Sequence, residues 1–244
     1  MKGLALAISL VVFAACATSH KSVESNPLAA LKLAAQRSVA KSSATLTGAM
    51  FNNGEQVVLF SGAMDLHRRA DLITLKPGPG GRSYPPYEAR FVGGWSYVQI
   101  DSAVQRPPTV RSGSAWIAFR QWPGGLPVPD RSLPPSFPID AVRLPLTQPK
   151  IAASFIDPPG TNPRRLSVRY LNGEYSASNY TYSIDRSGLL VALVISDPTT
   201  GHRLETFDFT YGGSAPSIVA PSGVQRLAPG ERLYPPKTTG PTSD

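Results

Sequence analysis

Cysteine and histidine are scarce in this chain. Cys16 is its single cysteine, and there are three histidines, His20, His67 and His202. One cysteine cannot form an intramolecular disulfide, so in an exported protein it is an intermolecular partner, a free thiol or a modified residue. No histidine has metal-ligand spacing to another histidine or to the cysteine. The composition therefore excludes a disulfide-stapled fold and predicts no metal site.

Signature motifs of common enzyme classes are also missing. The sequence contains no Gly-x-Ser-x-Gly elbow, no phosphate-binding loop and no dinucleotide fingerprint. Asp65 and Asp71 could flank a site as a carboxylate pair, but their place near a hairpin favours the surface. We therefore predict that the protein is not an enzyme and uses no cofactor.

Long apolar runs are absent except at the start, where one short run stands. The uncharged stretch Leu4–Ala15 follows Lys2 and is shorter than the roughly 20 residues that a membrane-spanning helix needs. A positive start, a short apolar run and small residues at a cleavage site are typical of a secretory signal. The sequence thus predicts a signal peptide over residues 1–15 and a protein that works outside the cytoplasm.

The end of this signal carries the cysteine. Phe13-Ala14-Ala15-Cys16 resembles the bacterial lipobox, in which Leu, Val or Ile, two small residues and Cys mark the cleavage site. The resemblance implies cleavage before Cys16, a diacylglyceryl thioether on Cys16 and attachment to the membrane through that lipid. Phe13 departs from the usual aliphatic residue. An ordinary signal peptide with a bystander cysteine is the alternative.

The chain is basic, with a formal net charge of +8. Its lysines and arginines are dispersed, and no run of them is longer than two. Dispersed charge in an exported protein favours a solvated basic face, with attraction to anionic lipid head groups as the alternative. We expect no nucleic-acid partner.

The periodicity divides the chain into a tether, one domain and a tail. Residues 16–25 are small and polar and predict a tether, residues 26–227 a single domain, and residues 228–244 a flexible tail rich in proline, threonine and glycine. Asn26-Pro27 predicts the start of a helix over Leu28–Ser42. A second helix is expected near Pro149–Ile156.

Between and after these helices the apolar period is two, which predicts strands. The expected strands are Thr45–Asn52, Gln56–Leu66, Ala70–Leu75, Tyr87–Val92, Trp95–Ile100, Ala115–Trp122, Arg165–Leu171, Ser178–Asp185, Leu189–Ser196, Arg203–Tyr211 and Ser217–Ala220. Consecutive hairpins predict an antiparallel meander, and a long sheet of this kind curls. The expected fold class is therefore α+β: a curved antiparallel β-sheet, a half-barrel meander, with the helices packed on its concave face.

Several of these segments resemble a known family. They are Gly62–Leu66, Arg68–Leu72, Glu88–Val98, Tyr180–Asp185 and Phe207–Gly212. In their order they resemble the actinobacterial lipoproteins of the LppX/LprG type, within the LolA- and LolB-like lipid carriers. The resemblance implies a half-open barrel closed by helices around a hydrophobic cavity, the binding of lipids outside the cytoplasm, and no catalytic residues.

Aromatic residues on the expected strands supply candidates for the wall of such a cavity. Core packing accounts for most aromatic residues, but apolar walls are also the rule in ligand cavities. The predicted inward-facing cavity residues are Phe60, Met64, Phe91, Phe207, Phe209 and Tyr211.

Two functions remain open from the sequence. The first is a lipid-anchored extracytoplasmic protein that binds or carries a lipid or other amphiphile in a hydrophobic cavity. The second is a non-enzymatic cell-envelope interaction or sensor module that binds a protein partner. The proline-rich stretch Pro123–Pro138 and the tail motivate the second, since such segments often space or dock other proteins.

Overall fold

The computed structural model describes residues 25–81, 86–99, 116–120 and 137–227. The predicted signal peptide, the lipidation site Cys16, nearly all of the tether, the tail and almost the whole of the proline-rich stretch lie outside these residues. Among the helices of the described ranges, none combines the length and the apolar character needed to cross a membrane.

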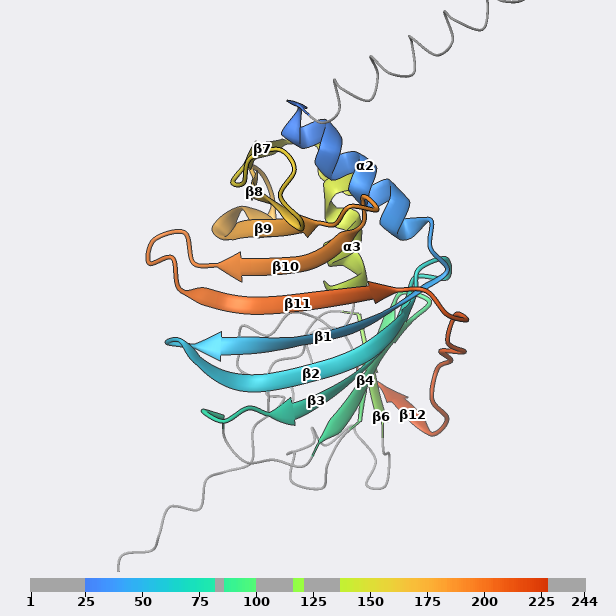
Figure 1. The fold of residues 1–244 in the computed structure, drawn as a ribbon. Coiled ribbons are helices and arrows are strands. Elements are labelled where there is room, and N and C mark those ends of the chain that lie inside the picture. Colours follow the sequence, from blue (N-terminus) through green and yellow to red (C-terminus); the bar gives the residue numbers. More distant parts are fainter. Residues whose placement is uncertain (1–24, 82–85, 100–115, 121–136, 228–244) are drawn as a thin grey trace, which may run out of the picture.

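The described strands form one curved sheet (Figure 1). They are β1 (Ser43–Asn52), β2 (Glu55–Asp65), β3 (Ala70–Pro77), β4 (Tyr87–Val92), β5 (Trp95–Gln99), β6 (Trp116–Phe119), β7 (Ile151–Phe155), β8 (Arg164–Tyr170), β9 (Asn179–Ile184), β10 (Leu190–Ser196), β11 (Arg203–Tyr211) and β12 (Val224–Arg226). Their order across the sheet is β12-β6-β5-β4-β3-β2-β1-β11-β10-β9-β8-β7. The sheet is open, with β7 and β12 at its two edges.

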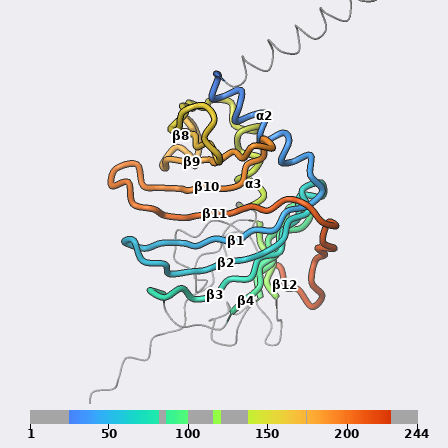
Figure 2. Tube along the Cα trace, in the orientation of Figure 1, coloured from blue at the N-terminus to red at the C-terminus, as the bar shows by residue number. Residues whose placement is uncertain are grey.

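Two meanders make up this sheet. Strands β1 to β6 follow one another antiparallel, as do β7 to β11, and β11 then pairs antiparallel with β1. Figure 2 shows this junction, where segments far apart in sequence run side by side. The short strand β12 pairs parallel with β6. The predicted fold class, a curved antiparallel sheet with helices on one face, is confirmed.

Helices α2 (Pro27–Val39) and α3 (Phe137–Thr147) pack against the sheet and against each other. A single 3-10 turn, η1 (Glu174–Ala177), precedes β9. α3 lies inside the curve of the sheet, and α2 lies across its β7–β9 end (Figure 1). The start of α2 is as predicted: Pro27 occupies the first turn, and the Asn26 side chain accepts the Ala29 N–H at 3.0 Å. The helix ends at Val39, before the predicted Ser42.

The prediction of a helix over Pro149–Ile156 is wrong. Residues Ile151–Phe155 form β7, whose side chains alternate between half-buried and exposed, and β7 pairs with β8. The second helix lies earlier, at α3, in a segment where prolines argued for loop. Pro138 falls in its first turn, where a backbone N–H has no acceptor within the helix, so a proline is tolerated there.

Pro145 lies inside α3, and a side chain on the sheet offsets its effect. Proline has no N–H, so the Ala141 carbonyl four residues earlier loses its usual donor. The Tyr182 hydroxyl on β9 donates to that carbonyl at 3.0 Å, and the Tyr170 hydroxyl lies 2.9 Å from the Tyr182 hydroxyl. Since the single hydroxyl proton of Tyr182 is donated to the Ala141 carbonyl, Tyr170 is the donor in that second bond. A helix with an internal proline is thereby fixed to the sheet.

The predicted terminal strand at Ser217–Ala220 is also wrong. That segment has no regular structure, and the last strand within the described residues is β12, which begins at Val224. The other expected strands match observed ones to within a few residues. Three predicted strand ends, Ile100, Ala115 and Trp122, lie outside the described residues.

The apolar core lies between the concave face of the sheet and the helices. α2 contributes Leu31, Ala34 and Ala35, and α3 contributes Ile139, Val142 and Leu144, all of them buried. The α2 residues recur at helical spacing, so α2 turns one apolar face inward. α3 is buried around most of its circumference, as expected for a helix inside the curve of the sheet.

Candidate functional site

The six predicted cavity residues all belong to the apolar core or pack against it. Phe60, Met64, Phe207 and Phe209 are buried, whereas Phe91 and Tyr211 are half-buried. Their role as ligand contacts stays a prediction.

Four of the six form a continuous row of aromatic rings. The Phe60 and Phe207 centroids are 5.1 Å apart, those of Phe207 and Phe209 are 6.2 Å apart, and those of Phe209 and Tyr211 are 6.5 Å apart. Gly48 on β1 makes this possible, because a β-carbon there would collide with the Phe60 ring. The glycine thus lets an aromatic side chain from β2 reach across β1 to β11.

Met64 and Phe91 lie apart from this row, on either side of a buried acid. In the strand register Asp71 on β3 stands between Met64 on β2 and Phe91 on β4. Asp71 is fully buried, and its carboxylate oxygens have no hydrogen-bond partner among the described residues. Burial, together with the nearby Asp140 carboxylate, raises the pKa of Asp71 well above its ordinary value. The expectation that Asp71 lies on the surface is therefore wrong; its partner in that expectation, Asp65, is buried too.

A second buried acid lies at the far end of the aromatic row. Glu205 on β11 precedes Phe207 on the same face and pairs in register with Met50 and Ile195. It is 7% exposed, and burial raises its pKa well above the ordinary value. Glu205 is not among the site residues predicted from the sequence. Its spacing of two, four and six residues from Phe207, Phe209 and Tyr211 is the signal that would have placed it on the same face of the strand.

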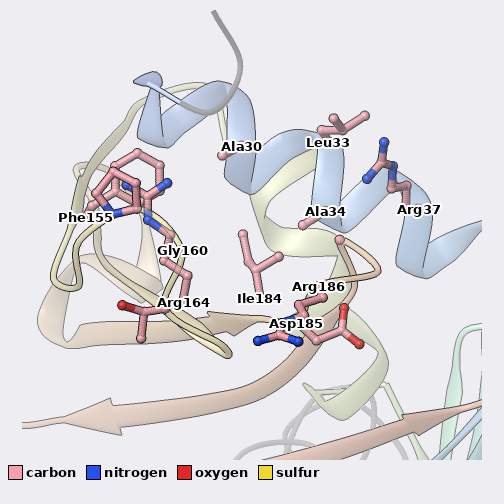
Figure 3. Close-up of a pocket in the computed structure, with 13 residues that line it drawn as sticks. Ala30, Leu33, Ala34, Arg37, Phe155, Gly160, Arg164, Ile184, Asp185 and Arg186 are labelled. Atoms are coloured by element: carbon pink, nitrogen blue, oxygen red, sulfur yellow. The ribbon is translucent and has the colours of Figure 1, made fainter. Parts of the chain in front are cut away.

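An open groove of about 520 Å³ lies at the other end of the molecule, between α2, the β7–β8 connection and the β9–β10 turn (Figure 3). Its apolar part consists of Ala30, Leu33, Ala34, Phe155 and Ile184. The Ile184 side chain points up toward α2, and Phe155 lies at the opposite end of the groove from Arg37 (Figure 3). Ala34, Phe155 and Ile184 also contact the apolar core, so the floor of the groove is continuous with it.

Basic side chains border this apolar floor. Arg37 comes from α2, Arg164 from β8 and Arg186 from the β9–β10 turn; Asp185 is the acidic residue of the lining. The Arg164 guanidinium stacks on the Phe155 ring, 3.3 Å from its centroid. Arg37 and Arg186 are exposed and have no ion-pair partner among the residues that the structure describes.

The β7–β8 side of the groove is held by an ion pair. The Arg165 guanidinium donates to both Asp157 carboxylate oxygens, at 2.9 and 2.7 Å, and its backbone N–H donates to one of them at 2.9 Å. These bonds lower the pKa of Asp157 to about 2. The connection that follows β7 is therefore fixed at its base.

The α2 side is held by contacts to the start of β10. The Ser38 hydroxyl, fully buried, accepts the Leu190 N–H at 2.9 Å, and the Tyr211 hydroxyl donates to the Leu190 carbonyl at 2.7 Å. The Arg37 guanidinium lies directly over Gly188, where a β-carbon would collide with it. Gly188 has a φ of +77°, so it serves both the turn and the approach of Arg37.

The groove was not predicted from the sequence because its lining comes from three separate segments: α2, the β7–β8 connection and the β9–β10 turn. Its arginines are among the dispersed cations that predicted a solvated face, and no local pattern joins residues 37, 164 and 186. No group of three or more metal-ligating side chains occurs in the part of the chain that the structure describes. An apolar floor with a basic border suits a ligand with an apolar chain and a polar end.

Fold and groove together define an open half-barrel with helices packed in its curve. No protein-family model matches the chain, and no curated protein matches its sequence. Among solved structures the chain is similar to LprF from Mycobacterium bovis, with 9% identity over 80% of this chain and 96% of that one and a TM-score of 0.38.

Two further solved structures are similar. MucB has 14% identity over 80% of this chain and 62% of its own length, with a TM-score of 0.40. A LolA-superfamily protein, NE2245 from Nitrosomonas europaea, has 9% identity over 77% of this chain and 93% of its own, with a TM-score of 0.34. The last of these structures is named as one of the LolA superfamily, to which the group that the sequence resembles belongs. At these identities the likeness is one of fold and decides nothing about ligands.

Proposed function

We propose that this protein binds or carries a lipid or other amphiphile outside the cytoplasm and catalyses no reaction. The observation that supports the proposal most is the groove, whose apolar floor is continuous with the core and whose volume of about 520 Å³ falls within the usual range of small-molecule sites. Each CH₂ group of an acyl chain that leaves water for such a floor contributes about 0.8 kcal/mol.

The proposal extends the binding surface inward from the groove. An acyl chain entering over Ala34 and Ile184 reaches side chains that already pack on the core. The six predicted cavity residues, from Phe60 to Tyr211, are the proposed deeper wall. Burial raises the pKa of the two acids on the same face, Asp71 and Glu205, and so favours their protonated forms, whose hydroxyl can donate to a polar group of the ligand.

The proposal also includes a membrane anchor at Cys16. Acyl chains on that residue would hold the domain at the extracytoplasmic side of the cell membrane, and more than one chain is needed for stable anchoring. Metabolic labelling with an alkyne fatty acid tests this part. The wild-type protein should be tagged and the Cys16→Ala variant should not; equal tagging of both would exclude the anchor.

Binding is tested with the purified full-length protein, by native mass spectrometry and by titration with monopalmitoylglycerol and with palmitate. Both ligands have one apolar chain, so at least one should bind in a one-to-one complex. Ala30→Phe fills the groove from α2 and should weaken binding by about tenfold or more.

Gln36→Phe is the matched control, since Gln36 is exposed on the same helix and does not line the groove. It adds the same ring and should leave binding unchanged. A protein that takes up neither ligand and carries no co-purified lipid would refute the proposed function. Equal binding by Ala30→Phe and wild type would show that the ligand does not bind in the groove.

A further inference from the structure

The geometry points to an anionic single-chain amphiphile as the ligand of the groove, with a carboxylate or phosphate head held by Arg37 and Arg186 while the chain lies on the apolar floor. This inference rests on the proposed function and adds the chemical class of the head group.

Positive charge is concentrated at the groove. Three arginines and one aspartate are part of its lining. Each arginine comes from a different element, so the tertiary fold and not a local run of basic residues brings them to one site. Guanidinium groups match the geometry of carboxylate and phosphate oxygens, which they can bind through two hydrogen bonds.

The three arginines of the groove differ in what they already contact. Arg164 is committed: it stacks on Phe155, and its Nε donates to the Asp157 carbonyl at 3.4 Å. Arg37 and Arg186 make no ion pair with any described residue, and both are exposed. They are the side chains with donors to offer an incoming anion.

The acidic member of the lining is already engaged. Asp185 Oδ1 accepts the Leu189 N–H at 2.9 Å and the Ser187 hydroxyl at 2.7 Å, so this carboxylate organises the β9–β10 turn. Its charge still opposes an anion in the groove. Removing the charge of Asp185 should therefore strengthen the binding of an anion, whereas removing the charge of Arg37 or Arg186 should weaken it. A purely structural role of Asp185 would not produce stronger binding.

Arg37 lies on the same side of α2 as the residues of the apolar floor. It follows Leu33 and Ala34 by about one helical turn, and so shares their side of α2. In Figure 3 the guanidinium of Arg37 lies at one end of the groove and Phe155 at the other, with Ile184 between them. A head group at the Arg37 end would leave its chain along Ala34 and Ile184 toward Phe155.

The test compares ligands that share a palmitoyl or palmityl chain and differ in the head. Palmitate and palmitoyl lysophosphatidate are anionic, and monopalmitoylglycerol and palmityl alcohol are neutral. The anionic pair should bind the full-length protein about tenfold more tightly than the neutral pair at low salt, and the difference should shrink as salt is added. Equal affinity for both pairs would overturn the inference while leaving the proposed function intact.

The arginine variants locate the effect. Arg37→Gln and Arg186→Gln should each weaken binding of palmitate about threefold and the double variant about tenfold, with monopalmitoylglycerol unaffected. Arg169→Gln is the control, because Arg169 is an exposed arginine on β8 outside the groove. An equal loss in Arg169→Gln would reduce the effect to net charge and contradict the site.

Two further arms complete the experiment. Asp185→Asn keeps an oxygen acceptor for the turn and removes the charge, so palmitate should bind about threefold more tightly. Weaker palmitate binding with an unchanged melting temperature would contradict the inference. Inorganic phosphate alone should fail to displace palmitate; displacement would show a simple anion site and not an amphiphile site.

Discussion

The two helices meet the sheet in opposite ways. Around α3 the contact is closed: Ile139, Val142 and Leu144 are buried, and the Tyr182 hydroxyl donates to the Ala141 carbonyl, which Pro145 leaves without its usual donor. At α2 the contact is closed on one side, through Leu31 and Ser38, and open on the other, where the groove begins. One interface holds the fold together, and the other leaves apolar surface and cationic side chains accessible.

The difference shows where binding can be added without unfolding the protein. A closed interface gains its stability from contacts that a ligand would have to replace. The groove borders the same core, but it is open, and Arg37 and Arg186 at its border are exposed, so a ligand can contact them without opening the core. Substitutions in the closed interface should therefore change the free energy of unfolding, and substitutions in the groove should change ligand binding.

The largest expected effect is on stability, in the aromatic row on the concave face. Phe207→Ala removes a buried ring between Phe60 and Phe209, and should lower the free energy of unfolding by about 3–5 kcal/mol. Leu33→Ala at the groove is the comparison, since Leu33 is only half-buried. Urea unfolding followed by tryptophan fluorescence measures both. Equal losses would mean that the groove is as tightly packed as the core.

The next effect concerns the hydrogen bond between β9 and α3. Tyr182→Phe leaves the Ala141 carbonyl and the Tyr170 hydroxyl without their partner, and should cost about 1–3 kcal/mol. Pro145→Ala restores an N–H that can donate to Ala141 within the helix, so it should recover part of this loss in the double variant. A double-mutant cycle on thermal unfolding tests this coupling; strictly additive losses would show that Tyr182 does not compensate for Pro145.

A smaller effect depends on pH through the buried acid at Asp71. Its pKa is raised in the folded state, so the folded protein holds a proton that the unfolded chain has released once the pH exceeds about 4. The contribution of Asp71 to stability is therefore most favourable below that pH and falls as the pH rises toward the raised pKa, by up to about 1.4 kcal/mol per pH unit. Asp71→Asn has no such proton, so its free energy of unfolding should rise relative to that of wild type as the pH increases from 4 to 7.

Urea midpoints for both proteins at pH 4, 5, 6 and 7 measure this difference. Asp208→Asn, at an exposed position on β11, is the control and should leave the pH dependence unchanged. Parallel curves for wild type and Asp71→Asn would contradict the raised pKa.

The smallest expected effect on stability is at the groove arginines. Arg37 and Arg186 are exposed and unpaired among the described residues, so Arg37→Gln and Arg186→Gln should change the free energy of unfolding by less than about 0.5 kcal/mol. Thermal unfolding without ligand measures this. A large loss would make these side chains structural and would remove the contrast between the two helix interfaces.

Much of the fold follows from local signals. Asn26-Pro27 predicts the start of α2, and alternation of period two predicts most strands, because each strand buries one face. The prediction fails at α3, where Pro138 and Pro145 argue against a helix. Tyr182, far away in sequence, replaces the donor that Pro145 lacks, and the apolar residues of α3 pack into the core; no local pattern predicts either contact.

The sequence by itself determined the alternation that curls one antiparallel sheet around an apolar face, and it placed Phe60, Met64, Phe207 and Phe209 among the buried residues. Only the tertiary structure decided where the charges lie. Asp71 and Glu205 are buried because strand register puts them on the apolar face, and Arg37, Arg164 and Arg186 meet because α2 lies across the end of the sheet. Local periodicity sets which face a residue takes, whereas the meeting of distant charges depends on how whole elements pack.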